Sequence, residues 1–178
     1  MKKAVIIYDS KTGNTEKVAF TIKGSIEKAG LNVSIIKVDE AKDIDFFNYD
    51  LVCIGTPIYQ TEGTKQLIDY LKFRTGNYMK QGKIKLGSPK VPGKNALIFC
   101  TYSGTHTGIN EAIPATKLIG QFFDHLGFTI VNELYVLSEH HRSEEESTKG
   151  RMGDIRGKPT DEELKKIAEK IEEIAKKI

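Results

Sequence analysis

The sequence predicts an α/β fold of the doubly wound type, in which one five-stranded parallel sheet carries helices on both faces. Five short apolar runs alternate with segments whose apolar residues recur at helical spacing. The run Leu51–Gly55 is apolar throughout, which is typical of a central parallel strand covered on both faces. The loops after the first, third and fourth strands carry unusual residues, and a strand order of 2-1-3-4-5 places these loops side by side.

The predicted strands are the five short apolar runs. They cover residues 3–8, 31–38, 51–55, 95–101 and 128–137. The second run alternates partly between apolar and polar residues, which suits an edge position. The segment 43–49 is short and aromatic, and we expect a turn of helix there that packs on the sheet.

The predicted helices cover residues 14–29, 64–75, 109–126 and 160–178. The first ends at Gly30, a residue suited to the position after a last turn. The third carries Pro114 in its early turns, where proline costs least. The last starts at Thr160 with Glu163 placed to complete a capping box, and its apolar stripe favours packing on the sheet.

Two long polar segments separate these elements. We expect a mobile surface loop at 76–94, and the alternative is a functional flap. The segment 138–159 combines two histidines, an acidic run and several basic residues. No internal repeat and no second unit is apparent, so we expect a single domain over residues 1–178.

The composition is ordinary for a globular protein of 178 residues, with a net charge of +3. The charge is modest and spread along the chain, so we expect no nucleic-acid partner. No apolar run reaches about 18 residues and the N-terminal run is too short for a signal peptide, so we expect no membrane partner and a cytoplasmic location. Cys53 and Cys100 lie in apolar runs without a CxxC motif. This favours buried thiols and excludes a cysteine-based iron–sulfur or zinc site.

The first unusual loop joins the first strand to the first helix. It consists of Ser10, Lys11, Thr12, Gly13, Asn14 and Thr15. The start of a helix leaves backbone N–H groups unpaired, and a hydroxyl-rich loop ahead of it can surround a phosphate. The loop taken alone is equally consistent with a simple turn in which Asn14 or Thr15 caps the helix.

The other two loops add aromatic rings. The second loop contributes Thr56, Pro57, Ile58 and Tyr59. The third loop runs from Thr101 to Gly108 and contributes Thr101, Tyr102, Ser103, Gly104, His106, Thr107 and Gly108. A phosphate cradle beside two aromatic-bearing loops suits a phosphorylated planar heterocycle, because such rings stack on aromatic faces.

These three motifs resemble the flavin-binding loops of the flavodoxin family, in order and spacing, over essentially the whole chain. The resemblance implies a flavodoxin-like fold that binds FMN. It implies that the first loop holds the phosphate through its side chains and the Lys11 and Gly13 amides. It also implies that Pro57, Ile58 and Tyr59 line one side of the isoalloxazine, while residues 102–108 line the other side and bind its pyrimidine edge.

The resemblance predicts an FMN-binding flavoprotein that transfers electrons between redox partner proteins. The alternative is an NAD(P)H-dependent FMN or quinone reductase of the flavodoxin-like type, so an enzymatic role stays open. Three differences from most flavodoxins favour this broader group: the mildly basic charge, the long segments, and Gln60 where many members have a glycine that permits a backbone flip. No protein nucleophile or general base is required, and we expect no catalytic residue and no metal ligand. Phe122, Phe123, Leu126 and Phe128 are suited either to the core or to the surface of a homodimer.

Histidines and arginines outside the main motifs are the remaining candidates. His106 is placed to contact the flavin. We expect His140 and His141 on a solvated surface, because adjacent histidines rarely face one metal ion. Arg151 and Arg156 flank Asp154, which indicates an internal arginine–aspartate pair or, as the alternative, a site near the flavin for a nicotinamide phosphate.

Overall fold

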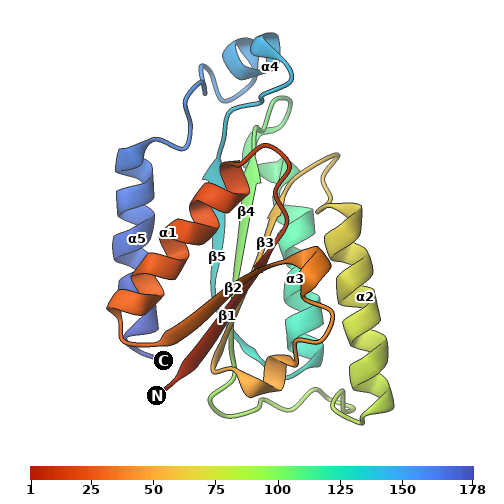
Figure 1. The fold of residues 1–178 in the computed structure, drawn as a ribbon. Helices are drawn as coiled ribbons and strands as arrows, with labels where there is room; N and C mark the ends of the chain where they lie inside the picture. Colours follow the sequence, from red (N-terminus) through yellow and green to blue (C-terminus); the bar gives the residue numbers. More distant parts are fainter.

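The computed structural model describes all 178 residues and contains one parallel sheet of five strands in the order β2-β1-β3-β4-β5 (Figure 1). The strands are β1 Lys3–Tyr8, β2 Asn32–Lys37, β3 Leu51–Pro57, β4 Asn95–Tyr102 and β5 Thr129–Leu137. Every neighbouring pair is parallel. The predicted fold class, strand order and edge position of the second strand are therefore confirmed.

Helices cover both faces of the sheet, as Figure 1 shows, with α1 and α5 on one face and α2 and α3 on the other. The α-helices are α1 Asn14–Lys28, α2 Lys65–Lys80, α3 Ile113–His125, α4 Glu144–Lys149 and α5 Asp161–Ala175. Short 3₁₀ helices are η1 Val38–Glu40, η2 Phe46–Asn48 and η3 Gly108–Glu111. None of the helices has the combination of length and apolarity that crossing a membrane requires.

The sheet separates two hydrophobic cores because successive side chains of a strand point to opposite faces. Along β1, Ala4 and Ile6 pack under α1 and α5, whereas Val5 and Ile7 pack under α2 and α3. All of β3 is buried, as a central strand requires. The aromatic group that includes Phe122, Phe123 and Phe128 lies in the second core and provides no dimer surface.

The start of α5 matches its sequence signal. The Thr160 hydroxyl accepts a hydrogen bond from the Glu163 amide at 3.2 Å, and the Glu163 carboxylate accepts one from the Thr160 amide at 2.8 Å. This capping box satisfies two N–H groups at the helix start. The apolar stripe behind it places Leu164, Ile171 and Ala175 in the first core.

Several element boundaries differ from the sequence prediction. The third strand extends through Thr56 and Pro57, because Pro57 still pairs with Thr101 of β4. The helix predicted over 109–126 begins only at Ile113, after the turn η3. The segment predicted as a polar connection at 138–159 contains α4.

The predicted loop 76–94 differs most, because α2 continues past Gly76 to Lys80. The rest of the segment is anchored at the amino ends of the strands. Val91 donates its amide hydrogen to Gly127 at 2.8 Å, and the Lys90 ammonium donates to the Phe128 carbonyl at 2.8 Å. The segment therefore does not form a flap over the loops that follow β1, β3 and β4. Its hydrogen bonds hold it more firmly than the predicted mobile loop would be held.

A hydrogen-bond network around Tyr78 explains the extension of α2. The buried Tyr78 hydroxyl accepts hydrogen bonds from the Phe46 amide at 2.8 Å and from the Arg74 guanidinium at 2.6 Å, and it donates to Asp45 at 3.1 Å. Burial is the main cause that raises the pKa of Tyr78 to about 12, so the hydroxyl keeps its proton. The network compensates for the helix-weakening Gly76 and holds η2 against α2.

Replacing Tyr78 by phenylalanine should lower the free energy of unfolding by about 2 kcal/mol, because it leaves the Phe46 amide and the Arg74 guanidinium short of a partner in a buried position. Urea unfolding monitored by circular dichroism measures the change as a lower midpoint with an unchanged slope. Tyr49→Phe is the matched control, because the Tyr49 hydroxyl makes no hydrogen bond, and it should change stability by less than about 0.5 kcal/mol. Equal effects of the two changes would contradict the role of the network.

Candidate functional site

The loops after β1, β3 and β4 meet at the carboxyl edge of the sheet and line two adjoining cavities of about 50 and 850 Å³. Predicted site residues that line the smaller cavity are Thr12, Asn14, Pro57, Ile58, Tyr59, Thr101, Tyr102 and Ser103. Those that line the larger cavity are Lys11, Ile58, Tyr59, Tyr102, Ser103, His106 and Thr107. Predicted residues that line neither cavity are Ser10, Gly13, Thr15, Thr56, Gly104 and Gly108.

The first loop presents free backbone donors. Gly13 is the N-cap of α1 with φ of 95°, so the alternative that Asn14 or Thr15 caps the helix is wrong. The Ser10 hydroxyl accepts hydrogen bonds from the Gly13 and Glu16 amides, both at 3.2 Å. Amides that donate to no group of the chain belong to Ser10, Lys11, Thr12, Asn14 and Thr15. Such a cluster at a helix start binds anions.

Buried threonines fix the loops from behind. The hydroxyls of Thr15 and Thr101 lie 2.7 Å apart and join the first turn of α1 to the end of β4. The Thr56 hydroxyl donates to the Pro57 carbonyl at 3.0 Å and accepts from the Thr64 amide at 3.1 Å, which fixes the path from β3 to α2. Thr15 and Thr56 therefore act as supports of the loops, and their hydroxyls already have partners.

The second loop contains a strained turn. The amides of Tyr59 and Glu62 each donate to the other residue's carbonyl, at 2.9 and 3.0 Å. The two residues between them, Gln60 and Thr61, have φ angles of 50° and 66°. Glycine adopts such angles readily, whereas a β-branched residue such as threonine rarely does. The turn next to the Tyr59 ring is thus held in a conformation that its sequence disfavours.

The third loop depends on two glycines with positive φ. A Cβ atom on Gly104 would lie 2.9 Å from the Cα of Gly108, so the chain closes on itself only with glycine there. The Glu111 carboxylate accepts hydrogen bonds from the His106 and Thr107 amides, both at 2.7 Å. The resemblance predicts that residues 102–108 bind the edge of a heterocycle. The amides of His106 and Thr107 already donate to Glu111, so they have no free hydrogen for that edge.

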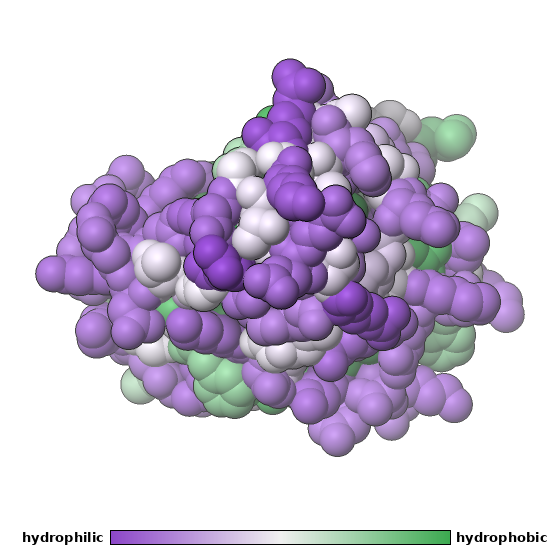
Figure 2. Space-filling model, turned by 90° about the horizontal axis from the view of Figure 1, so that it is seen from above, coloured by the Kyte–Doolittle hydropathy of each residue, from purple (hydrophilic) through white to green (hydrophobic).

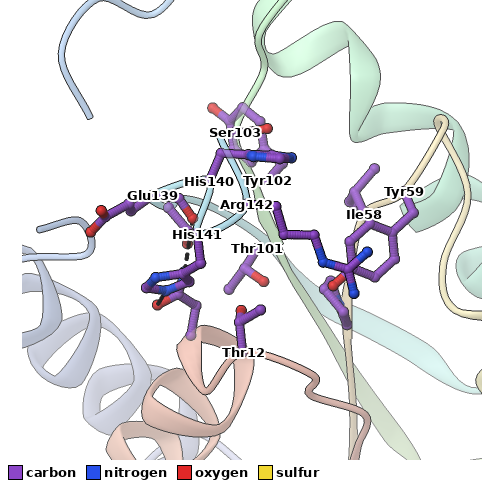
Figure 3. Close-up of a pocket in the computed structure, with 13 residues that line it drawn as sticks. Thr12, Ile58, Tyr59, Thr101, Tyr102, Ser103, Glu139, His140, His141 and Arg142 are labelled. Atoms are coloured by element: carbon purple, nitrogen blue, oxygen red, sulfur yellow. Dashed lines mark hydrogen bonds between the residues drawn. The ribbon is translucent and has the colours of Figure 1, made fainter. Parts of the chain in front are cut away.

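Residues 138–142 form a fourth wall that the sequence does not predict. The Asn14 side-chain amide donates to the Glu139 carbonyl at 3.2 Å, and the Asn14 side-chain oxygen lies 3.3 Å from Nε2 of His141. His140, His141 and Arg142 line the smaller cavity (Figure 3). His141 is exposed, as expected, whereas His140 is half-buried. The sequence contains one signal for this wall, which is its position: the segment follows β5, and β5 is the neighbour of β4.

The loop at 150–157 lies against the third loop. Arg151 donates its amide hydrogen to the Thr105 carbonyl at 2.8 Å. The Arg156 guanidinium contacts the Asp154 carboxylate through two nitrogens and holds the pKa of that carboxyl well below its usual range, at about 2. The internal arginine–aspartate pair is thus present, and the pairing occupies Arg156.

The site is polar at its rim and aromatic inside. The surface over the carboxyl ends of the strands is predominantly hydrophilic (Figure 2). Burial raises the pKa values of Tyr59 and Tyr102, so both rings stay neutral at physiological pH. The Lys11 ammonium lies 5.3 Å from the centre of the Tyr59 ring. The site can therefore stack a planar ligand and bind an anion at its α1 end.

A family model described as "Flavodoxin" matches residues 6–171. The chain belongs to the flavodoxin family. Flavodoxins bind FMN, and this site suits that ligand, because free amides and hydroxyls at α1 adjoin a cavity between two aromatic-bearing loops. In addition, Nδ1 of His140 in the fourth wall is buried without a hydrogen-bond partner.

Known proteins similar to this chain show the same family and fold. The chain is 38% identical over 56 residues to "Probable flavodoxin 1" of Bacillus subtilis, covering 32% of this chain and 35% of that protein. It is 42% identical over 55 residues to the flavodoxin-like domain-containing protein BilS of Clostridioides difficile, covering 30% of each. The chain thus spans about a third of these relatives.

Among solved structures, oxidised Flavodoxin 1 of Bacillus cereus has a TM-score of 0.67 and 19% identity over 99% of both chains. Two-electron reduced flavodoxin of Megasphaera elsdenii has a TM-score of 0.59 and 17% identity over 98% of this chain and 99% of that chain. These structures share the fold.

Replacing either Thr15 or Thr101 by valine should lower the free energy of unfolding by about 1–2 kcal/mol, because the remaining hydroxyl is buried without a partner. The double variant should cost less than the sum of the two single changes, since it removes both hydroxyls at once. Urea unfolding of the four proteins measures the coupling. Additive effects would show that the two hydroxyls do not support each other.

Proposed function

We propose that this chain binds FMN and carries electrons between redox partner proteins. The observation that carries the proposal is the cluster of five unpaired amides in the first loop, which adjoins the cavity that the two aromatic loops line. A terminal phosphate satisfies such donors, and the adjoining cavity takes the ring of the same molecule. The two unpaired, buried thiols Cys53 and Cys100 support a cytoplasmic location.

The residues divide between the two ends of the ligand. The amides of the first loop and the Thr12 hydroxyl, which has no partner in the chain, bind the phosphate. Pro57, Ile58 and Tyr59 lie on one side of the ring, with Tyr102 and Ser103 on the other. Lys11 lies over Tyr59, so the phosphate is held mainly by neutral donors. FMN supplies the redox chemistry, while the protein binds it, orients it and shields one part of it from water.

The alternative is a reductase that takes electrons from NAD(P)H. A phosphate-binding arginine on the 150–157 loop would favour it, but Asp154 occupies Arg156, and Arg151 lines neither cavity. We therefore favour the carrier, whose partners are other redox proteins. Adding NADPH to the FMN-loaded protein decides between the two: the flavin absorbance should persist, whereas dithionite should bleach it. Bleaching by NADPH within seconds would contradict the carrier.

Replacing Thr12 by alanine should weaken FMN binding about tenfold, because a hydrogen bond to a charged phosphate is lost. The affinity for riboflavin, which has no phosphate, should stay unchanged. Quenching of flavin fluorescence on titration measures both dissociation constants. Thr21→Ala, in helix α1 and outside the first loop, is the control and should change neither constant. A similar loss for riboflavin and FMN would contradict the assignment of Thr12 to the phosphate.

A further inference from the structure

Arg142 brings a positive charge to the ring end of the site. It lies at the end of the fourth wall and lines both the smaller and the larger cavity. Figure 3 shows its guanidinium extended toward Tyr59 and Ile58. Arg142 thus lines both cavities, and its guanidinium lies on the Tyr59 side of them.

The backbone that carries Arg142 is fixed on several sides. The Ser138 amide donates to the Tyr102 carbonyl at 2.8 Å, and the His140 amide donates to the Ser147 hydroxyl at 2.9 Å. Asn14 binds the Glu139 carbonyl from the side of α1. The wall therefore has bonds to the third loop, to α4 and to α1, and these bonds hold the base of the Arg142 side chain beside the cavity.

The charge of Arg142 has no carboxylate partner. The carboxylates of the neighbouring wall are engaged elsewhere: Glu139 accepts from the Gly157 amide at 2.9 Å, and Glu146 faces Thr105 and His140. Near Tyr59 lie Asp9 and Lys11, which are opposite in sign, and Glu62 belongs to the same turn. Arg142 therefore adds a positive charge beside the aromatic loop that no carboxylate neutralises by direct contact.

We propose that Arg142 places its positive charge beside the ring of bound FMN and thereby favours the reduced cofactor over the oxidised one. This inference rests on the proposed function. A flavin gains negative charge in its ring on reduction, whereas the charge of its phosphate stays the same. A cation near the ring therefore binds the reduced form more tightly and raises the reduction potential, while a cation that acts only on the phosphate strengthens both forms equally.

The exposure of the Arg142 side chain limits the size of its effect on the reduction potential. Arg142 is exposed in the chain, and its charge is therefore partly screened by water and salt. We expect the preference for reduced FMN to fall about tenfold in Arg142→Gln, which lowers the two-electron midpoint potential by about 30 mV. Arg142→Lys keeps the charge and should retain most of the preference.

The experiment compares the dissociation constant of oxidised FMN with the midpoint potential of bound FMN in the wild type, Arg142→Gln and Arg142→Lys. Fluorescence titration gives the first quantity, and equilibration with a reference dye gives the second. Together they give the affinity for reduced FMN. Arg151→Gln is the matched control, because it removes the same charge from a neighbouring loop but lines neither cavity.

The expected result is a selective loss of affinity for reduced FMN in Arg142→Gln, with Arg151→Gln unchanged. Equal losses for both oxidation states, or an equal shift in Arg151→Gln, would overturn this inference and leave FMN binding intact. A wild-type protein that binds no FMN would contradict the proposed function and this inference with it.

Discussion

The parallel direction of all five strands is the constraint on which the site depends. Parallel strands place all their carboxyl ends at one edge, and the order β2-β1-β3-β4-β5 makes β1, β3 and β4 neighbours there. Three loops that are far apart in sequence therefore meet without any contact that is specific to the loops themselves. The buried hydroxyl pair of Thr15 and Thr101 then fixes the first loop to the third. The sheet thus provides the approximate position, and a few buried polar contacts provide the detail.

Much of the fold and three walls of the site can be predicted because their signals are local. A continuous apolar run such as Leu51–Gly55 indicates a central strand, and Thr160 with Glu163 indicates the start of a helix, without knowledge of the remaining chain. Position after a strand is equally local, and it places the first loop, Ile58 and Tyr59 at the cavity. The boundaries are less certain, since Pro57 extends β3 only because Thr101 is there to pair with it.

The features that the sequence does not predict depend on individual contacts, most of them between residues far apart in the sequence. The fourth wall exists because Asn14 binds residues 139 and 141, more than 120 positions away. The amides of His106 and Thr107 are occupied because η3 brings Glu111 back to them. Helix α2 continues past Gly76 because the Tyr78 hydroxyl forms hydrogen bonds with Phe46 and Asp45, which lie outside the helix. The local sequence around these residues does not reveal which partners they bind.

The turn at Gln60 and Thr61 and the side chain of Arg142 both lie beside the Tyr59 ring. The turn at Gln60 and Thr61 is strained, yet reciprocal hydrogen bonds between Tyr59 and Glu62 hold it in place. A backbone flip there would break these bonds and would have no glycine to ease it. A loop that resists rearrangement cannot adjust its donors to the oxidation state of a ligand at low cost. Near such a loop, a charge beside the ring is a means by which the protein can distinguish reduced from oxidised cofactor, and Arg142 provides such a charge beside Tyr59.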